Sequence, residues 1–442
     1  MYTNFHRPSR LLTPLGLALM MLLLIATGCS DKSNEDDSLQ LLSTVPADAG
    51  MVSVINLDVL VSQSGGKVKD GKVQQADALE KMAGQYLKGH DLEVAKWLLS
   101  PESGVECSSA VLFFYKSRPY LYALIADEDA LRAGIDKLWP GEWQTSGKTS
   151  HKEQVAIRDG RVLLLPDTDA TPAETFANLS EPSSFRSNAY AETLAKSSDA
   201  FSSWATLDAL WTGAGLSFSD LTLARMAMNM AFKNPKYLTG AANISDGGLT
   251  TSVSVLDADM KPAHCELAVS QLDTKLISAF GGNANCVMAV AVSQKLVKQL
   301  MQLGSSFGGQ LPPAFSSAIE SLDGTVAIAS SAELDNMKGS DVESAGFKCT
   351  IQTNGKNNAA LLQTLEAVMG KAKIEGNTFT FGNDAYGNGI APVADVAKTF
   401  DGAWLGVATA TPLADGKGKG CLYLTLKPAD GSLRMDVKYV IK

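Results

Sequence analysis

The sequence predicts an α+β protein made of two similar halves, each with mainly antiparallel strands and helices packed on the sheet. Two observations predict this class. A pattern of a turn, a short strand and a helix-like segment recurs along the chain. In addition, several expected strand pairs are joined by short turns rich in Gly, Asp and Asn, which is typical of hairpins and therefore of antiparallel pairing.

The recurring pattern occupies four stretches of the chain. Each opens with Asp or Asn beside a small residue and continues into a strand, and in at least three of them a helix-like segment follows. Asp and Asn suit such turns because their side chains hydrogen-bond neighbouring backbone groups. The stretches are residues 47–63, 198–213, 282–299 and 400–416.

The segments between these stretches match in order as well. Asp127 can cap a helix that ends before Pro140, and its counterpart carries Leu361, Leu365 and Val368. Hairpins are expected at Asp159-Gly160, Asp246-Gly247-Gly248, Gly376-Asn377 and Pro428 to Gly431. The expected halves are therefore residues 41–262 and 263–442, related by internal duplication; the alternative is chance similarity among strand–helix segments.

The first 28 residues predict a lipoprotein signal peptide. Basic residues from His6 to Arg10 precede an apolar run from Leu11 to Ile25, which is too short for a convincing membrane-spanning helix. Ala26 and Gly28 then precede Cys29, the expected site of lipidation, where two or three acyl chains would anchor the protein firmly to a membrane. The alternative is an ordinary secretory signal followed by a chance cysteine.

Residues 29–40 are expected to form a lipidated acidic tether. The run from Ser30 to Asp37 contains no apolar residue and is not expected to fold by itself. The run resembles the surface-export signal of Bacteroidota lipoproteins, with candidate residues Ser30, Asp31, Glu35, Asp36 and Asp37. Asp37-Ser38-Leu39 resembles the short O-glycosylation sequon of the same bacteria, with Ser38 as the acceptor. The alternative for the acidic run is a solvated tether, with the protein facing the periplasm.

A family resemblance follows from the residues after the tether. The segment LLSTVPADAGMVSVINLDVLVSQSG, residues 41–65, resembles the opening of an uncharacterised Bacteroidota lipoprotein family. The similarity is specific from Pro46 to Leu57 and becomes diffuse later. That family has no assigned activity, so the resemblance implies the same address and supplies no functional residues.

Composition excludes some classes of function. The chain of 442 residues has a formal net charge of −9, and the expected signal holds arginines but no acidic residue, so the remainder is more acidic still. An acidic chain is a poor partner for nucleic acid, whose phosphates require basic patches. Five cysteines follow Cys29, an odd number that cannot all pair within the chain, and they show no CxxC spacing. Cys107, Cys286, Cys349 and Cys421 lie in apolar strand-like runs and are expected to be buried free thiols, with pairing among the cysteines as the alternative.

One motif resembles a serine-hydrolase nucleophile. Residues 304–308 match G-x-S-x-G, which needs a strand before the serine and a helix after it. Here a helix-like segment precedes Ser306, and no histidine occurs after His264 to complete the order of that catalytic triad. A flexible glycine–serine loop is the expected structure.

Two other patterns suggest cofactors or metals only superficially. Residues 66–72 have the spacing of a phosphate-binding loop, but Val73 stands where Ser or Thr must hold magnesium, so a loop that enters a helix is expected. His90, His151 and His264 form no paired-ligand spacing. The sequence therefore predicts no catalytic residue, metal ligand or cofactor.

These observations favour a non-enzymatic outer-membrane lipoprotein, displayed at the cell surface and acting through binding to an unknown protein or glycan. One alternative is a hydrolase of glycans or peptides with a site of scattered carboxylates. Another is a periplasm-facing structural or chaperone-like lipoprotein. The sequence does not decide among them.

Overall fold

The structure is a computed structural model of the chain that divides into two compact units. Unit 1 comprises Met1–Met226 and Pro235–Lys261, and unit 2 comprises Ala227–Asn234 and Pro262–Lys442. The structure describes residues 35–441, apart from residues 78, 81–83, 85–86, 117, 166–169, 214–217, 246–247, 266, 268–269, 307–312, 332–345, 357, 384–385, 388, 390, 413–418 and 430. Over these residues, no helix has the length and apolar character needed to span a membrane.

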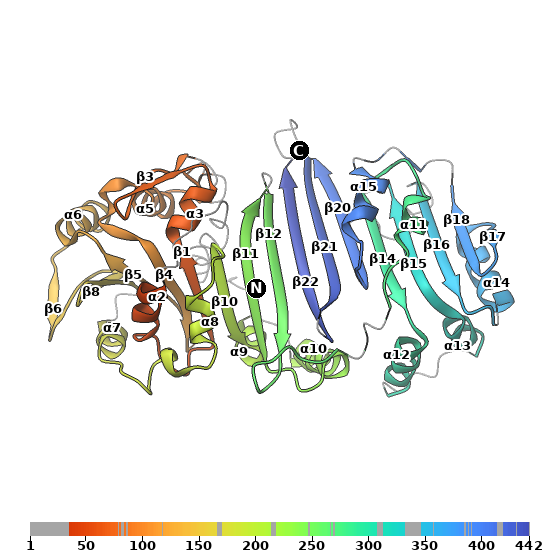
Figure 1. Cartoon of the computed structure of the whole chain (residues 1–442), viewed down its shortest axis with the longest axis horizontal. Helices are drawn as coiled ribbons and strands as arrows, with labels where there is room; N and C mark the ends of the chain where they lie inside the picture. The colour runs from red at the N-terminus through yellow and green to blue at the C-terminus, as the bar shows by residue number, and fades with distance from the viewer. Residues whose placement is uncertain are drawn as a thin grey trace, which may run out of the picture. The chain divides into compact units, whose positions relative to one another are not determined.

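Unit 1 is built on one antiparallel sheet (Figure 1). Its strands lie in the order β6-β7-β8-β9-β5-β4-β1-β10-β11-β12. Their bounds are Met51–Asn56 (β1), Val105–Tyr115 (β4), Arg118–Ile125 (β5), Gln144–Ser146 (β6), Thr149–Lys152 (β7), Val155–Arg158 (β8), Arg161–Leu164 (β9), Phe201–Thr206 (β10), Tyr237–Ser245 (β11) and Gly248–Leu256 (β12). A separate hairpin joins β2 (Lys67–Lys69) to β3 (Lys72–Gln75).

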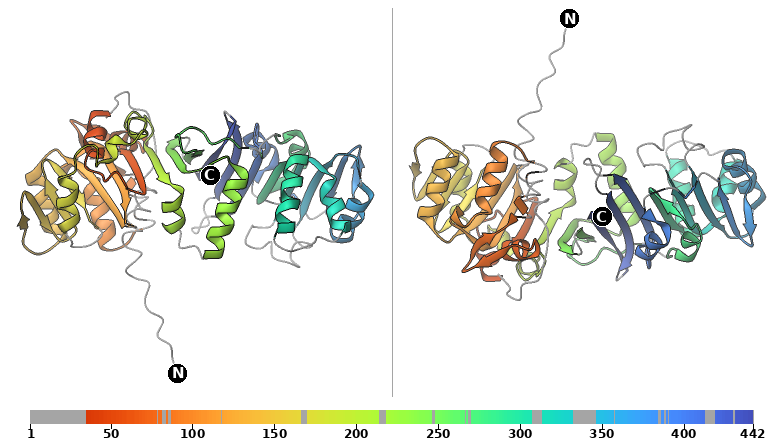
Figure 2. Two further views of the ribbon diagram at one scale, coloured as in Figure 1. Left: turned by 90° about the horizontal axis from the view of Figure 1, so that it is seen from below. Right: turned by 90° about the horizontal axis from the view of Figure 1, so that it is seen from above.

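Helices cover both faces of this sheet (Figure 2). Successive strand residues point to opposite faces, so Val54 and Ile55 of β1 belong to different cores. One core receives side chains from α3 (Leu57–Gln63), α5 (His90–Leu98) and α6 (Glu128–Leu138). The other receives α2 (Glu35–Leu42), α7 (Ala170–Ala177) and α8 (Ala191–Ala195). Two further helices, α9 (Leu207–Gly213) and α10 (Phe218–Ala231), follow β10.

Unit 2 also contains an antiparallel sheet. Its strands lie in the order β17-β18-β16-β15-β14-β20-β21-β22. Their bounds are Cys286–Val292 (β14), Leu322–Ser330 (β15), Phe347–Thr353 (β16), Lys373–Glu375 (β17), Thr378–Gly382 (β18), Leu405–Pro412 (β20), Lys419–Ala429 (β21) and Ser432–Ile441 (β22), and β13 (Asn283–Ala284) pairs with β19 (Ala391–Pro392). Its helices are α11 (Thr274–Ser278), α12 (Gln294–Ser306), α13 (Pro313–Glu320), α14 (Asn358–Met369) and α15 (Val393–Thr399).

The predicted α+β class is confirmed, and so are several of its local signals, whereas the expected turns at residues 246–248 and 428–431 include residues 246, 247 and 430, which lie outside the described residues. The Asp127 side chain accepts a hydrogen bond from the Ala130 N–H at the start of α6, as expected of a helix cap. The turns at Asp159-Gly160 and Gly376-Asn377 join β8 to β9 and β17 to β18. All five described cysteines are unpaired and buried.

Two expectations are corrected. The predicted tether at residues 29–40 is wrong from residue 35 onward, because α2 begins at Glu35 and its Leu41 and Leu42 are fully buried. The acidic residues at its first turn favour the helix, since negative charge stabilises the positive end of the helix dipole. The glycine–lysine segment at residues 66–72 belongs to the β2–β3 hairpin and not to a loop that enters a helix.

Candidate functional site

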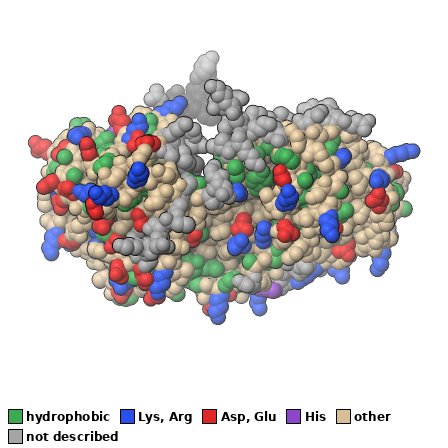
Figure 3. Space-filling model, turned by 45° about the horizontal axis from the view of Figure 1, so that its top comes forward, with side chains coloured by type: hydrophobic (Ala, Val, Ile, Leu, Met, Phe, Trp, Pro, Cys, Tyr) green, Lys and Arg blue, Asp and Glu red, His purple; other side chains and the backbone are tan. Residues whose placement is uncertain are grey.

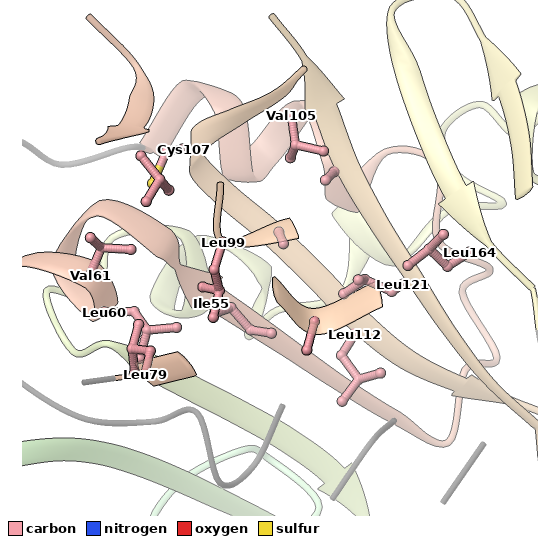
Figure 4. Packing of buried hydrophobic residues seen from close by; sticks show 14 of the residues in the cluster. Ile55, Leu60, Val61, Leu79, Leu99, Val105, Cys107, Leu112, Leu121 and Leu164 are labelled. Carbon is pink, nitrogen blue, oxygen red and sulfur yellow. The ribbon is translucent and has the colours of Figure 1, made fainter. Parts of the chain in front are cut away.

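An apolar cavity of about 70 Å³ lies in unit 1 between the sheet and helices α3 and α5. Strand residues Ile55, Val105, Ala110, Leu121 and Ala123 line it from one side. Leucine and alanine side chains of α3 and α5, with Leu99 at the end of α5, line the other. Figure 4 shows five of these residues within the surrounding cluster of buried side chains: Ile55, Leu60, Leu99, Val105 and Leu121.

The cavity depends on two small side chains in adjacent strands. Ala110 of β4 lies directly opposite Ala123 of β5, and Ile55 of β1 lies opposite Ala110 on the other side. Protein cores are normally packed to the density of organic crystals, so two methyl side chains in one row of a sheet leave space that larger neighbours do not reach. Both alanines are at most 5% exposed.

The chemistry of the cavity is that of binding an apolar group. Every lining side chain is apolar, and apolar cavities of this kind stay dry and accept apolar ligands. Cys107 belongs to the same cluster, and burial raises the pKa of its thiol to about 12. The thiol therefore stays protonated at neutral pH and is a poor nucleophile.

A second hollow, of about 220 Å³, lies on the opposite face of the same sheet. We call it the hydroxyl groove, because Ser, Thr and Tyr residues supply most of its lining. The hydroxyl side chains come from α8 and the loop after it (Tyr190, Thr193, Ser197), from β10 (Ser202), from β11 (Thr239) and from β12 (Ser252, Ser254). Ser203 also borders the groove, but its Oγ donates to the Gly240 carbonyl oxygen on the opposite face of β10. Asp199 is the charged residue of this lining.

A network of hydrogen bonds fixes one end of the hydroxyl groove. Ser202 Oγ donates to Ser197 Oγ, which donates to Asp199 Oδ2 at 2.9 Å. Asn56 Nδ2 donates to the carbonyl oxygens of Ser197 and Asp199 at 2.9 and 2.6 Å. Asn243 Nδ2 donates to the other Asp199 carboxylate oxygen. The turn that carries Asp199 is therefore held from β1 and from β11.

The residues predicted to direct export are only partly described. Cys29, Ser30 and Asp31 lie outside the described residues, whereas Glu35, Asp36 and Asp37 form the first turn of α2. Ser38 is fully buried, and its Oγ lies 2.8 Å from Ser109 Oγ in a hydrogen bond. Glycosylation of Ser38 stays a prediction, and it requires a chain that has not yet folded.

Among the described residues, the serine-hydrolase and metal-binding patterns of the sequence lack the surroundings that such sites need. Ser306 is the last residue of α12, so a helix precedes it where a nucleophile elbow needs a strand. Within the described part of the chain, no three His, Cys, Asp or Glu side chains gather as metal ligands. The sequence predicts neither the cavity nor the hydroxyl groove, because no sequence motif marks either of them.

Comparisons with known proteins add little. No protein-family model matches the chain, and no curated protein matches it. The chain is similar to a solved structure, crystal form I of TP0453, at 9% sequence identity over 81% of this chain and 96% of that one, with a TM-score of 0.21. A TM-score this low carries no argument about fold or function.

Proposed function

We propose that this protein is a non-enzymatic, lipid-anchored protein of the bacterial outer membrane whose unit 1 binds an apolar group in the cavity beside Ala110 and Ala123. The observation that carries this proposal is the wholly apolar lining of the cavity. Such a lining offers no acid, base or nucleophile, and it favours a ligand with an alkyl or similar apolar part.

The proposed cellular localisation follows from the N-terminal sequence. Cys29 would carry the acyl chains, and the acidic residues from Ser30 to Asp37 would direct the protein to the cell surface, as in the Bacteroidota lipoproteins that residues 46–57 resemble. Protein or glycan partners are compatible with the surface in Figure 3, where basic and acidic side chains are interspersed among the described residues. Nucleic acid is not proposed as a partner.

We also propose that the two units arose by duplication of one domain, a proposal supported by their strand registers. Met51 of β1 lies opposite Phe114 of β4 and Ala205 of β10. Cys286 of β14 lies opposite Ser330 of β15 and Thr409 of β20. Counted from Met51 and from Cys286, the residue pairs of β4–β1–β10 in unit 1 follow the same register as those of β15–β14–β20 in unit 2.

The outer strands support the same equivalence. In both units the last two strands pair with each other, β11 with β12 and β21 with β22. Two-residue turns join β8 to β9 in unit 1 and β17 to β18 in unit 2. In unit 1 the register of the β4–β5 pair shifts between Val105 and Ala110, near the start of β4. In unit 2 the register of the β15–β16 pair shifts between Leu322 and Val326, near the start of β15. Equivalent positions can therefore be assigned strand by strand.

Under the proposed duplication, the two units differ at the cavity. The row that holds Ala110, Ala123 and Val162 in unit 1 corresponds to Val326, Ile351 and Phe379 in unit 2. Ile351 and Phe379 are 6% and 2% exposed and pack with Val326 in one core. In unit 2, larger side chains fill the row that stays open in unit 1. This difference supports a binding role for unit 1.

A binding experiment tests the proposed role of the cavity. Xenon, followed by ¹²⁹Xe NMR, and straight-chain alcohols of increasing length, followed by calorimetry, are suitable apolar probes. The Ala110→Val/Ala123→Ile double variant, which copies unit 2, should weaken binding at least tenfold, whereas Val326→Ala in unit 2 should leave the unit 1 affinity unchanged. Equal binding by the double variant and the wild type would refute the proposal.

A separate experiment tests the proposed localisation at the cell surface. Protease treatment of intact cells should remove the protein if it is displayed at the surface, with lysed cells as the control. Protection in intact cells and digestion after lysis would favour the periplasm-facing alternative. Cys29→Ser should release the protein from the membrane fraction. Specific hydrolysis of a glycan or peptide by the purified protein would instead favour the enzyme alternative.

A further inference from the structure

We infer that the hydroxyl groove of unit 1 is a second binding site, for a neutral polyhydroxy ligand of the size of one sugar ring. This inference goes beyond the proposed function, because it concerns the opposite face of the sheet and requires neither the apolar cavity nor the lipid anchor. It rests on the chemistry of the lining, on the rigid turn at Asp199 and on the contrast with unit 2.

The lining matches the hydrogen-bonding pattern of a saccharide. Serine and threonine hydroxyls each donate one hydrogen bond and accept others, as sugar hydroxyls do. Neither lysine nor arginine is among the lining residues, so a phosphate or sulfate would find no counter-charge. Asp199 adds a carboxylate that disfavours anions and accepts from hydroxyl groups.

The capacity of Asp199 is not exhausted by its protein partners. A carboxylate offers about four lone-pair positions, and the side chains of Ser197 and Asn243 donate one hydrogen bond each to its two oxygens. Positions remain for a ligand hydroxyl on the side that borders the groove. Because Asn56 and Asn243 already hold this turn, binding would not need to order it, which reduces the entropic cost of association.

The size of the groove limits the ligand. Its volume of about 220 Å³ lies below the roughly 300 Å³ at which pockets for drug-sized ligands begin. This volume matches one sugar ring. The ligand is therefore a free monosaccharide or a single residue of a longer glycan.

Unit 2 carries aromatic side chains around the corresponding positions. By strand register, Ser202 corresponds to Gly406 and Thr239 corresponds to Tyr423. A Cβ on Gly406 would lie 2.6 Å from the ring of Phe400, which is fully buried. Tyr423 is 9% exposed. Two aromatic side chains therefore occupy in unit 2 the region that small hydroxyl side chains leave open in unit 1.

The test uses the purified chain and defined sugars. Saturation-transfer NMR and calorimetry would measure binding of glucose, galactose and N-acetylglucosamine, with their linear hexasaccharides and inorganic phosphate as further probes. We expect at least one monosaccharide to bind saturably and phosphate not to bind. Binding of the hexasaccharide alone would identify a glycan chain as the source of the ring. Binding of phosphate, or of no sugar, would overturn the inference.

Substitutions in and beside the hydroxyl groove test whether the sugar binds there. Thr239→Tyr copies unit 2 and should weaken sugar binding at least tenfold, whereas Thr251→Tyr, on the opposite face of β12, should not change it. Ser254→Lys, which copies Lys438 at a partly exposed position, should also weaken binding and serves as the second variant if Thr239→Tyr unfolds. Equal affinities for wild type and both groove variants would exclude this groove as the site.

Discussion

Ala110 and Ala123 lie directly opposite each other on β4 and β5, and both line the apolar cavity of unit 1. A gap between packed side chains lowers stability, because the lining atoms lack protein packing partners on one side. We therefore expect Ala110→Val to raise the free energy of unfolding by about 0.5–2 kcal/mol, as cavity-filling substitutions commonly do. Urea denaturation at neutral pH would measure the change.

The control for this prediction is a buried alanine with little space beside it. Ala156 is 3% exposed and borders a hollow of only about 10 Å³. Ala156→Val should destabilise the protein by about 1–3 kcal/mol, the usual cost of overpacking a core. If both substitutions destabilise the protein equally, the space beside Ala110 is not available to a ligand either.

A second prediction concerns a helix glycine. Glycine in a helix is normally less favourable than alanine by about 1 kcal/mol. A Cβ on Gly134 of α6, however, would overlap the indole of Trp97. We expect Gly134→Ala to destabilise the protein by about 1–3 kcal/mol through overpacking, against the helix propensity. The thermal midpoint of unfolding, followed by circular dichroism, is a sufficient measurement.

Gly84 provides the matched control for Gly134. It is helical and exposed, and a Cβ there would meet no atom within 4 Å. Gly84→Ala should therefore leave stability unchanged or raise it by up to about 1 kcal/mol. A stabilised Gly134→Ala variant would show that the Trp97 side chain moves aside at little cost.

A third prediction concerns pH. The Ala130 N–H, and then the Lys72 ammonium, hold the pKa of the Asp127 carboxyl below its ordinary value. A lowered pKa in the folded state stabilises the fold above the unfolded pKa of about 3.9, and this contribution is lost as pH falls through the folded value. Asp127→Asn keeps the helix cap and removes the charge.

The variant should therefore be less stable than the wild type at pH 7, and the difference should shrink as pH falls below about 4. Unfolding by urea across this range would show it. Asp127→Ala, which also removes the cap, should be less stable than Asp127→Asn at pH 7. A stability difference that does not change with pH would mean that the charge of Asp127 contributes nothing.

The sequence predicts those parts of the fold that local chemistry determines. Asp159-Gly160 and Gly376-Asn377 fit two-residue hairpin turns, and Asp127 fits a helix cap, because each depends only on neighbouring residues. The predicted end of the tether at residue 40 is wrong because it depends on residues farther along the chain. Residues 30–37 contain no apolar side chain, but the helix that begins at Glu35 is anchored by Leu41 and Leu42, beyond that run.

Neither candidate site is visible in the sequence. Ala110 and Ala123 are unremarkable alanines in apolar strands until the register places them side by side, and helices α3 and α5 leave the space beside them open. The hydroxyl groove likewise joins residues near 200, 240 and 253 that only the β10–β11–β12 ladder brings together. Long-range pairing decides both features, and no short motif reports it.

The last prediction concerns the contact between Phe400 and Gly406. Because the Phe400 ring lies where a Cβ on Gly406 would project, Gly406→Ser should destabilise unit 2 by about 1–3 kcal/mol. The reciprocal change in unit 1, Ser202→Gly, removes a hydroxyl that bonds Ser197 Oγ and should cost about 1 kcal/mol. In a double-mutant cycle, the effect of Gly406→Ser should be smaller in a Phe400→Ala background, since that substitution removes the ring. If the two effects simply add, the ring does not limit the side chain at position 406, and the filled state of unit 2 has another cause.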